Sequence, residues 1–540
     1  MANNMMQQLF QAEYYSSSSS LLLLLWLALA AATLSVPLLR LRLTPRGPPL
    51  PPGPWPLPVI GNMLMMGRLT HRGLAALAGR HGGLFHLRLG RVHAVVVSSP
   101  AHAREVLSVQ DAAFSGRPAS AAVAYLTYGR ADMAFAPYGR FWRQVRRLSS
   151  TRLFSSRRSQ SWLAVRDESA ALVRAIAESS GSGGEVVDVG ELMFVLTKNV
   201  VFRAAFGAGE SRGRRQEELV ERLHEFSELM GVFSVGDFFP WLRWVDGLRG
   251  VNGRLRRARG GLDELVDGII DEHVEGKKRK GDVDADMVDD MFAFLDDDDL
   301  AAAGKIKDDG DNDDDGLRLT RDNIKAIIMD FMFGGTETVA AAMEWAMAEL
   351  LRSPNDLRRV QQELTETIGL DRTVEETDIN TPDSLPFLRC IVKETLRLHP
   401  PVPLLLHESM TDCVVGGYTV PRRSRVIVNL WAIGRDRSAW GLDADTFRPA
   451  RFVGEAAHVD LKGGCFELLP FGSGRRACPA MVFGMYEMEL ALARLLHAFE
   501  WALPDGVKPE ELDMGDVFGL TLPRAVRLRA VPKLRLTCSL

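Results

Sequence analysis

Residues 470–480 read Pro-Phe-Gly-Ser-Gly-Arg-Arg-Ala-Cys-Pro-Ala. Gly472 and Gly474 permit tight turns, because glycine readily adopts positive φ angles. Cys478 then precedes a helical pattern over residues 481–501, and the proline after it suits the first helical position. The free N–H groups and the positive end of such a helix favour an anionic sulfur. A thiolate in this position is a good metal ligand.

A buried structural cysteine is the simpler interpretation of this segment. However, roughly 0.002 chance matches to its Phe, Gly, Arg and Cys at these spacings are expected in a chain of this composition. The segment resembles the haem-binding loop of the cytochrome P-450 superfamily, Phe-x-x-Gly-x-Arg-x-Cys-x-Gly. Phe471, Gly474, Arg476 and Cys478 match that pattern. The last position departs from it, because Ala480 replaces the glycine and its methyl group must fit the local packing.

The resemblance implies a haem-thiolate monooxygenase whose cofactor is haem b (iron protoporphyrin IX), with Cys478 as the metal ligand. Thiolate donation favours O–O cleavage. The expected fold is mainly α with a smaller β part. It would form a single haem-centred cytochrome P-450 domain over residues 59–540, preceded by one N-terminal transmembrane helix. The expectation of one catalytic domain replaces the three or four domains that the length alone suggests.

Four residues are candidates for holding the haem propionates. Trp142 and Arg146 lie four residues apart and therefore share one helix face. In the family this face meets a propionate, and Arg476 is a further candidate. His407 stands where many relatives place an arginine, although its charge depends on pH.

Glu394 and Arg397 form an i,i+3 pair, and Arg451 follows downstream. Alone, such a pair is usually a surface salt bridge that contributes little stability. The family uses this pattern as a buried Glu–Arg–Arg network near the haem loop. The resemblance therefore implies that these three residues are structural rather than catalytic.

A long helix is predicted from Asp322 to Arg352, with Thr320 as its N-cap. At a rise of ~1.5 Å per residue it spans about 46 Å. Its interior contains the charged residues Lys325, Asp330 and Glu337. They indicate a core helix rather than a second membrane span.

Within this helix, residues 334–338 read Gly-Gly-Thr-Glu-Thr. Two glycines cost about 1 kcal/mol each relative to Ala, so they need a reason. A close helix crossing is one reason, and an opening that leaves room for dioxygen over a flat cofactor is another. The segment resembles the family's oxygen-activation motif, so Thr338 would hydrogen-bond dioxygen and Glu337 would relay protons through water. A threonine that bonds back to its own helix is the alternative.

A narrower resemblance, over most of residues 319–540, is to the plant ferulate 5-hydroxylase (coniferaldehyde 5-hydroxylase) group. Residues 322–354, 400–408 and 511–523 carry it. It implies NADPH- and O2-dependent 5-hydroxylation of the ring of guaiacyl phenylpropanoids (ferulate, coniferaldehyde, coniferyl alcohol) in syringyl lignin biosynthesis. Another phenylpropanoid or flavonoid ring hydroxylase is the alternative. A haem-thiolate isomerase or dehydratase and a haem sensor are disfavoured, because neither needs the Glu337–Thr338 pair.

The substrate pocket is expected on the haem-facing side of the long helix and in segments where the family places substrate contacts. Aromatic walls suit a flat phenolic ring. Asp330 would either meet a phenol hydroxyl or cap a buried network. The candidate pocket residues are Asp330, Phe331, Phe333, Gly334, Leu404, Leu405, Phe518 and Thr521.

After an N-terminal segment (residues 1–20), residues 21–39 carry no charge, and a basic, proline-rich linker (residues 40–58) follows. About 20 apolar residues span a bilayer. Charge after the apolar run argues against a cleaved signal peptide, the alternative. By the positive-inside rule, the catalytic domain would face the cytosol from a single-pass anchor in the endoplasmic reticulum membrane. An NADPH-dependent flavoprotein reductase in that membrane would supply electrons.

The composition is that of a globular protein, with 46% hydrophobic and 25% charged residues. A formal charge of −4 gives no support to nucleic-acid binding, which needs a basic face. Five cysteines without a CxxC pair do not make a disulfide framework. The Asp-rich residues 281–316 are expected to form a flexible loop rather than a calcium site, because the spacing of a calcium loop is absent.

Overall fold

The computed structural model describes residues 47–118, 120–155, 159–179, 185–207, 222, 225–226, 228–276, 287–292, 318–381 and 384–538. The chain forms two units, a small one of residues 1–50 with 417–419 and a large one of residues 51–416 with 420–540. The expected N-terminal segment and transmembrane anchor lie outside the described residues.

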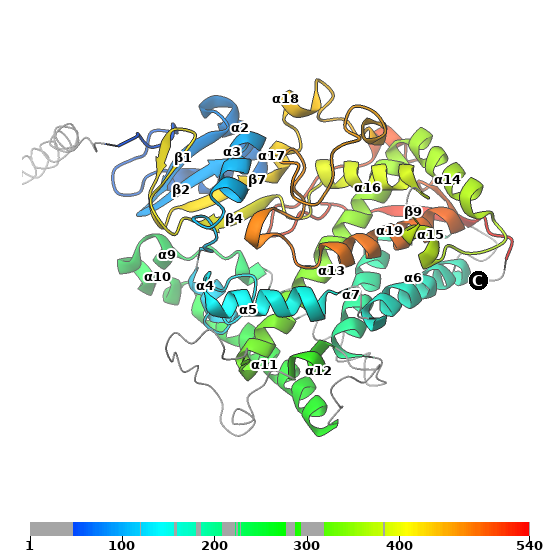
Figure 1. The fold of residues 1–540 in the computed structure, drawn as a ribbon, viewed down its shortest axis with the longest axis horizontal. Coiled ribbons are helices and arrows are strands. Elements are labelled where there is room, and N and C mark those ends of the chain that lie inside the picture. The colour runs from blue at the N-terminus through cyan, green and yellow to red at the C-terminus, as the bar shows by residue number, and fades with distance from the viewer. Residues whose placement is uncertain are drawn as a thin grey trace, which may run out of the picture. The chain divides into compact units, whose positions relative to one another are not determined.

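Helices dominate the large unit, and the longest, α13 (Arg321–Arg352), packs against α7, α14, α16 and α19 (Figure 1). The other long helices are α6 (Ser159–Ser179), α7 (Val189–Phe206), α11 (Val251–Gly276), α14 (Pro354–Ile368), α16 (Pro386–Leu398) and α19 (Met481–Ala498). The shorter ones are α2 (His71–His81), α3 (Pro100–Arg104), α4 (Ala121–Leu126), α5 (Arg140–Leu148), α9 (Val235–Phe238), α10 (Arg243–Leu248), α12 (Met287–Phe292), α15 (Glu376–Asn380), α17 (Leu430–Ile433) and α18 (Arg437–Trp440).

A capping box starts α13 at the predicted place. The Thr320 side chain accepts from the Asn323 backbone N–H, and the Asn323 side chain accepts from the Thr320 backbone N–H. The helix ends at Arg352, because the next residue precedes a proline. Its length and hydropathy would allow a membrane span, but 61% of its most apolar window is buried in the fold. It is therefore a core helix, as predicted.

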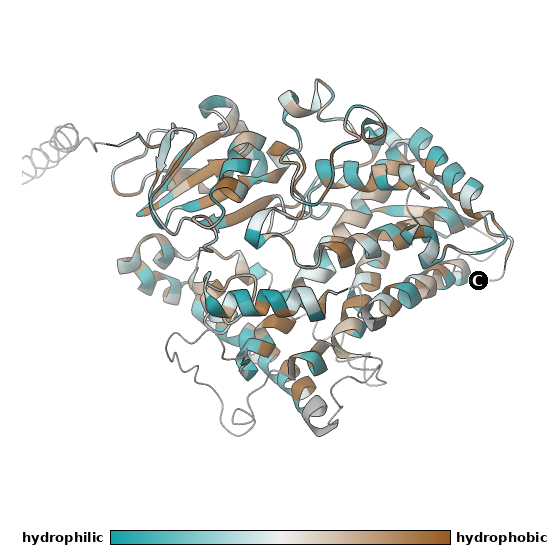
Figure 2. Cartoon of the chain, in the orientation of Figure 1, coloured by the Kyte–Doolittle hydropathy of each residue, from teal (hydrophilic) through white to brown (hydrophobic). Residues whose placement is uncertain are grey.

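Strands form the smaller part of the described structure. The main sheet has the order β1–β2–β7–β4, with β2 and β7 parallel and the other pairs antiparallel. Its strands are mostly hydrophobic, whereas the peripheral α14 is mostly hydrophilic (Figure 2). The expectation of a mainly α fold with a smaller β part is confirmed. The strands are β1 (Leu84–Leu89), β2 (Val92–Val97), β3 (Val187–Asp188), β4 (Leu404–Glu408), β5 (Cys413–Val415), β6 (Tyr418–Val420), β7 (Arg425–Asn429), β8 (Phe499–Ala502) and β9 (Arg529–Leu534).

Three local predictions are wrong. The helix after the cysteine loop ends at Ala498, because residues 499–502 alternate buried and exposed side chains and pair with β9. That helix starts at Met481, so Pro479 lies one residue before its N-cap. Residues 281–316 are not all loop, because α12 buries three apolar side chains at helical spacing (Met287, Val288 and Met291).

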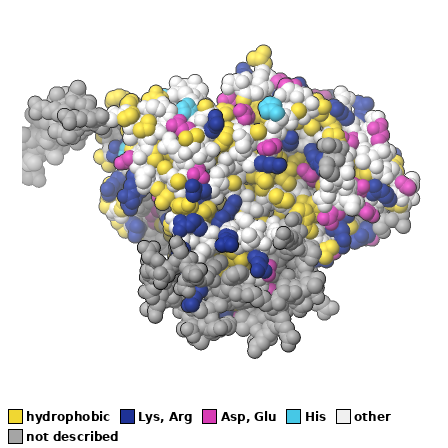
Figure 3. Space-filling view, viewed as in Figure 1, with side chains coloured by type: hydrophobic (Ala, Val, Ile, Leu, Met, Phe, Trp, Pro, Cys, Tyr) yellow, Lys and Arg dark blue, Asp and Glu magenta, His cyan; other side chains and the backbone are white. Residues whose placement is uncertain are grey.

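The surface carries both signs of charge. On the face shown in Figure 3, Lys and Arg side chains are interspersed with Asp and Glu side chains. Mixed charges of this kind are usual for the solvated surface of a globular protein.

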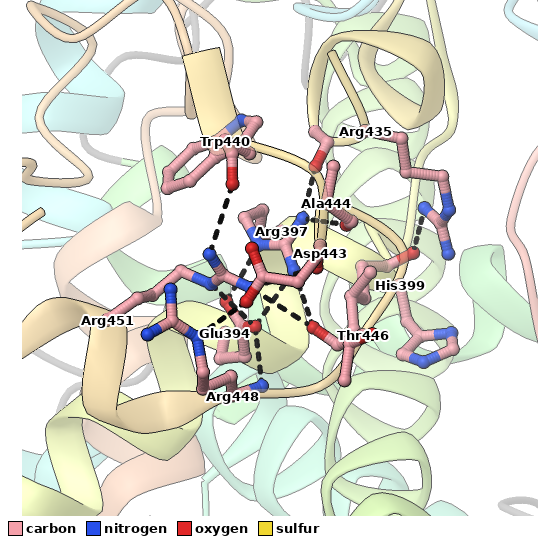
Figure 4. Close-up of polar contacts among 12 residues, drawn as sticks. Glu394, Arg397, His399, Arg435, Trp440, Asp443, Ala444, Thr446, Arg448 and Arg451 are labelled. Atoms are coloured by element: carbon pink, nitrogen blue, oxygen red, sulfur yellow. Dashed lines mark hydrogen bonds and ion pairs between the residues drawn. The ribbon is translucent and has the colours of Figure 1, made fainter. Parts of the chain in front are cut away.

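One buried carboxylate, Glu394 of α16, joins segments that are distant in sequence (Figure 4). Arg397 donates to both of its oxygens, at 2.7 and 2.8 Å, and the Arg451 Nε donates to one of them at 2.9 Å. The two guanidinium groups also donate to backbone carbonyls within residues 434–446. The structure thus brings the three expected residues into one network, and nearly all of their surface is buried.

We expect Glu394→Ala to destabilise the fold by about 3–5 kcal/mol, because it leaves two guanidinium groups buried without their carboxylate. Denaturant unfolding measures the change. Glu455→Ala is the matched control, since Glu455 pairs with Arg448 on the surface and should change the midpoint little. Equal midpoints for the two variants would contradict a structural role of the network.

Candidate functional site

A cavity of about 360 Å³ lies in the large unit, between α13, the cysteine loop, β4 and the segment before α5. Its wall is mainly apolar with a few polar groups, as in small-molecule sites. The lining residues used below are Arg117, Met133, Ala134, Trp142, Arg146, Asp330, Phe331, Gly334, Thr338, Leu405, Phe471, Arg476, Cys478 and Glu487.

Two glycines shape the loop that carries Cys478. Gly472 and Gly474 have φ angles of 72° and 67°, in the region where other residues are strained. A side chain on Gly474 would also lie 2.2 Å from the carbonyl oxygen of Leu107. The loop closes with a 2.8 Å hydrogen bond from the Cys478 N–H to the carbonyl of Phe471. The Cys478 side chain therefore faces the cavity.

Opposing effects act on the Cys478 sulfur. Burial raises the pKa of the thiol, whereas the hydrogen bond from the Ala480 N–H and the charge of Arg146 act to lower that pKa. The hydrogen bond from the start of the helix lowers the thiol pKa as expected, but desolvation raises that pKa by more. A cation bound at the sulfur would reverse this balance, because a coordinating thiol loses its proton.

Arg146 is the basic residue best placed to receive an anion. It lies on α5 at the cavity wall, and none of the carboxylates in the described ranges forms an ion pair with it. Burial lowers its pKa, which indicates a cation held without full compensation. A carboxylate in the cavity would supply the missing partner.

Arg476 and Trp142 hold protein backbone instead. Arg476 donates to the carbonyls of Ser115 at 2.8 Å and of Ala136 at 2.6 Å. The Trp142 indole N–H donates to Met133 at 3.1 Å, and Arg476 lies over its ring at 4.4 Å. Both residues line the cavity, but their hydrogen bonds mainly fix its wall.

His407 does not line the cavity. It lies two residues further along β4 than Leu405, where its Nδ1–H donates to the carbonyl of Phe114 at 2.8 Å. Burial and the nearby Arg117 lower its pKa to about 3, so the ring is neutral at pH 7. Arg117 lies at the cavity wall, where sequence reasoning did not place a cation, and it donates to the carbonyls of Ala134 and Leu406. The sequence around Arg117 does not predict its place at the cavity wall, because its hydrogen-bond partners are backbone carbonyls far along the chain.

The expected acid–alcohol pair is split by the structure. Thr338 lines the cavity, and its hydroxyl donates to the carbonyl of Gly334 at 2.6 Å. Glu337 does not line the cavity, and its Oε2 accepts a 3.0 Å hydrogen bond from the Thr521 hydroxyl. The lone pairs of the Thr338 oxygen remain available as acceptors.

Half of the candidate pocket residues reach the cavity. Asp330, Phe331, Gly334 and Leu405 line it, and the Asp330 carboxylate caps two backbone N–H groups. The remaining candidates lie elsewhere. Phe518 is 42% exposed and packs near the His71 ring. The residues outside the lining are Phe333, Leu404, Phe518 and Thr521.

Glu487 of α19 is a cavity residue that sequence reasoning missed. Its side chain is buried, and neither of its oxygens has a hydrogen-bond partner among the described residues. Burial raises its pKa well above that of an ordinary glutamate. Periodicity alone makes this position look like part of a core-facing helix stripe.

These residues fit a haem. A free sulfur, an unpaired guanidinium and an apolar wall meet in one cavity, as an iron porphyrin with carboxylate side chains requires. No grouping of three or more His, Cys, Asp or Glu side chains that could hold a metal ion occurs in the part of the chain that the structure describes. Cys478 would bind the iron, and Arg146 would hold a propionate.

Comparisons with known proteins agree with this site. The family described as Cytochrome P450 matches residues 51–527. Cytochrome P450 84A1 of Arabidopsis thaliana is 55% identical over 501 residues, covering 92% of this chain and 93% of the relative. Cytochrome P450 84A4 of the same plant is 49% identical, covering 91% and 93%. Flavonoid 3'-monooxygenase CYP75B137 of Crocosmia x crocosmiiflora is 38% identical, covering 95% and 98%.

A solved structure shares the fold. The zebra fish cytochrome P450 with progesterone matches with a TM-score of 0.70 and 24% sequence identity. The match covers 86% of this chain and 99% of that chain. The cytochrome P450 resemblance drawn from the sequence is thereby confirmed.

Haem retention should distinguish Arg146 from His407. Arg146→Gln removes a charge-assisted contact worth ~1.5–3 kcal/mol, so haem should be lost about 10–100 times faster. His407→Gln should leave the rate almost unchanged near pH 7, because that ring is neutral and outside the cavity. Transfer of haem to an acceptor protein measures both rates. Faster loss from the His407 variant alone would contradict these placements.

Proposed function

The chain belongs to the cytochrome P450 family and is a haem-thiolate monooxygenase, and from this premise we propose that it hydroxylates the ring of guaiacyl phenylpropanoids at the 5-position. Ferulate, coniferaldehyde and coniferyl alcohol are the proposed substrates, in syringyl lignin biosynthesis. The observation that carries the proposal is the close resemblance of residues 322–354, 400–408 and 511–523 to the ferulate 5-hydroxylase group. Two of these segments contribute to the cavity wall, through α13 and β4.

The cavity suits a small aromatic substrate. Phe331 and Leu405 form parts of its apolar wall, and Phe154 packs against Phe331 with ring centroids 5.6 Å apart. Stacked and tilted aromatic contacts bind flat rings well. A phenylpropanoid ring held against this wall would be fixed in orientation, and such positioning controls both rate and site of attack.

When bound, haem supplies the activation of dioxygen. Cys478 would provide the sulfur ligand, and Arg146 would balance a propionate charge. The absence of a side chain at Gly334 leaves room beside α13, whereas Gly335 allows a close approach of Val201 of α7. The Thr338 oxygen, whose own proton is donated to Gly334, keeps lone pairs that would accept a hydrogen bond from a water in the cavity and so hold a proton there.

The electron supply and location belong to the same proposal. Two electrons would come from NADPH through a flavoprotein reductase, and O2 would be the co-substrate. Uncharged residues 21–39 followed by arginines support a single-pass anchor in the endoplasmic reticulum membrane. The catalytic domain would then face the cytosol.

Flavonoid ring hydroxylation is the second candidate. A flavonoid 3'-monooxygenase is among the relatives, and both substrate classes present a phenolic ring for hydroxylation beside an oxygen substituent. The lower identity of that relative makes this the weaker alternative.

Thr338→Ala should retain haem and substrate binding but divert NADPH consumption toward peroxide, because the hydroxyl that holds a proton in the cavity is lost. Thr336→Ala is a matched control, since Thr336 bonds back to Met332 on the same helix and lies outside the cavity lining. The ratio of product to NADPH measures coupling. Equal ratios in the two variants would make Thr338 a purely structural residue.

Membranes that contain this protein and a reductase should convert coniferaldehyde to its 5-hydroxy product and show a substrate-induced spin-state shift. Ferulate and coniferyl alcohol are assayed in parallel, so that the three substrates, which differ at the end of the side chain, can be ranked. The proposal fails if a flavonoid is converted efficiently while the guaiacyl compounds give neither a spectral shift nor a product.

A further inference from the structure

Residues 131–136, named here the cavity strap, form one wall of the cavity through Met133 and Ala134. The strap contains no helix or strand, so its backbone groups need partners from elsewhere. Its carbonyls accept from the side chains of five residues outside the strap. These donors are Asn323 to Ala131, Trp142 and Arg476 to Met133, Arg117 to Ala134, Arg130 to Phe135, and Arg476 to Ala136.

The N–H groups of the strap depend on two carboxyl groups. Asp330 of α13 accepts from the N–H of Met133 at 2.8 Å and from the N–H of Ala134 at 3.0 Å. Asp132, within the strap, accepts from the N–H of Phe135 at 3.1 Å. These three bonds, together with the bond from Asn323 to Ala131, tie the strap backbone to α13 and to itself.

The two carboxyl groups also contact each other. Asp132 is fully buried, and its Oδ1 receives no donor from the described residues. Asp132 makes a side-chain hydrogen bond with Asp330. Two carboxylates cannot hydrogen-bond, because neither has a hydrogen, so one of the pair must carry a proton.

Three arginines lie near the two carboxyl groups, but none of them forms an ion pair with Asp132 in the described ranges. Arg130 of the same loop, Arg117 and Arg476 act on Asp132 electrostatically. Their N–H groups are directed at backbone carbonyls instead. Glu408, which faces Arg130, is the remaining charged group there.

Asp246 provides a comparison elsewhere in the fold. It also accepts from two consecutive backbone N–H groups, those of Val235 and Gly236 at 2.8 Å each. These bonds and a hydroxyl donor lower its pKa. Asp330 accepts the same kind of bonds, yet burial raises its pKa to about 6. The different outcome reflects the stronger desolvation of Asp330, which outweighs its hydrogen bonds.

We infer that Asp132 and Asp330 share one proton and that this shared proton fixes the cavity strap against α13. Protonated Asp132 donates to ionised Asp330, which then satisfies three donors at once. This assigns Asp132 as a positioning residue, because it acts on the substrate only through Met133 and Ala134. The inference concerns the cavity wall and holds whichever aromatic substrate is used.

The direction of the pH dependence follows from the pair. Burial raises the pKa of both carboxyl groups above the unfolded value of 3.8, so the folded chain binds protons more tightly than the unfolded chain. The stabilisation is therefore complete at low pH and is lost as the pH rises through the folded pKa values. Alkaline conditions should loosen the strap.

Hydrogen–deuterium exchange of the haem-containing full chain, corrected for intrinsic rates, tests the inference between about pH 5 and pH 8. Protection at Met133 and Ala134 should fall with rising pH by up to about tenfold per unit. Asp132→Asn keeps an N–H donor toward Asp330 at every pH, so its protection should vary less than about twofold. Asp132→Ala should lose the protection of these two amides at every pH in this range.

Asp246→Asn is the matched control and should leave exchange in the strap unchanged. Constant protection in the wild type would overturn the inference. Loss of protection in Asp132→Asn would also overturn it, because a cation held between two carboxylates would behave in that way. The dissociation constant of coniferaldehyde, read from the spin-state shift, should follow the same pH profile. Failure of coniferaldehyde to bind the wild type bears on the proposed function alone.

Discussion

The positive φ angles of Gly472 and Gly474 turn the chain so that the Cys478 side chain faces the cavity, and the other walls are tied to that turn. Gly474 packs directly against the carbonyl of Leu107. The next residues of the loop continue the connection, since Arg476 donates to carbonyls of the strap and of the segment before it. A side chain at Gly474 would therefore displace both the sulfur and the opposite wall.

The charges around the cavity are distributed unevenly. Arg117, Arg146 and Arg476 are cations whose pKa values fall because of burial, but they remain charged at pH 7. Burial raises the pKa values of the acids Asp132 and Glu487. Burial thus disfavours carboxylates that would compete with an anionic group for the same cations.

Sequence reasoning succeeded where a residue's role depends on its own segment. The capping box at Thr320 and the loop around Cys478 are local patterns, and both have the predicted placement in the chain. It failed where a role depends on how far the cavity extends along a strand or loop. Leu405 and His407 share one face of β4, but the cavity reaches only Leu405, and His407 bonds to the carbonyl of Phe114. Phe518 lies in a C-terminal segment whose packing no local pattern predicts.

The sequence by itself determined the family, the haem ligand expected at Cys478 and the mainly helical fold, because these follow from short motifs with strict spacing. The tertiary structure alone decided which groups share the cavity. It placed Asp132 against Asp330, some 200 residues away in the chain, and left Arg146 without a carboxylate partner in the described ranges. Protonation and pairing depend on distances through space and on exclusion of water, and neither is encoded in the order of neighbouring residues.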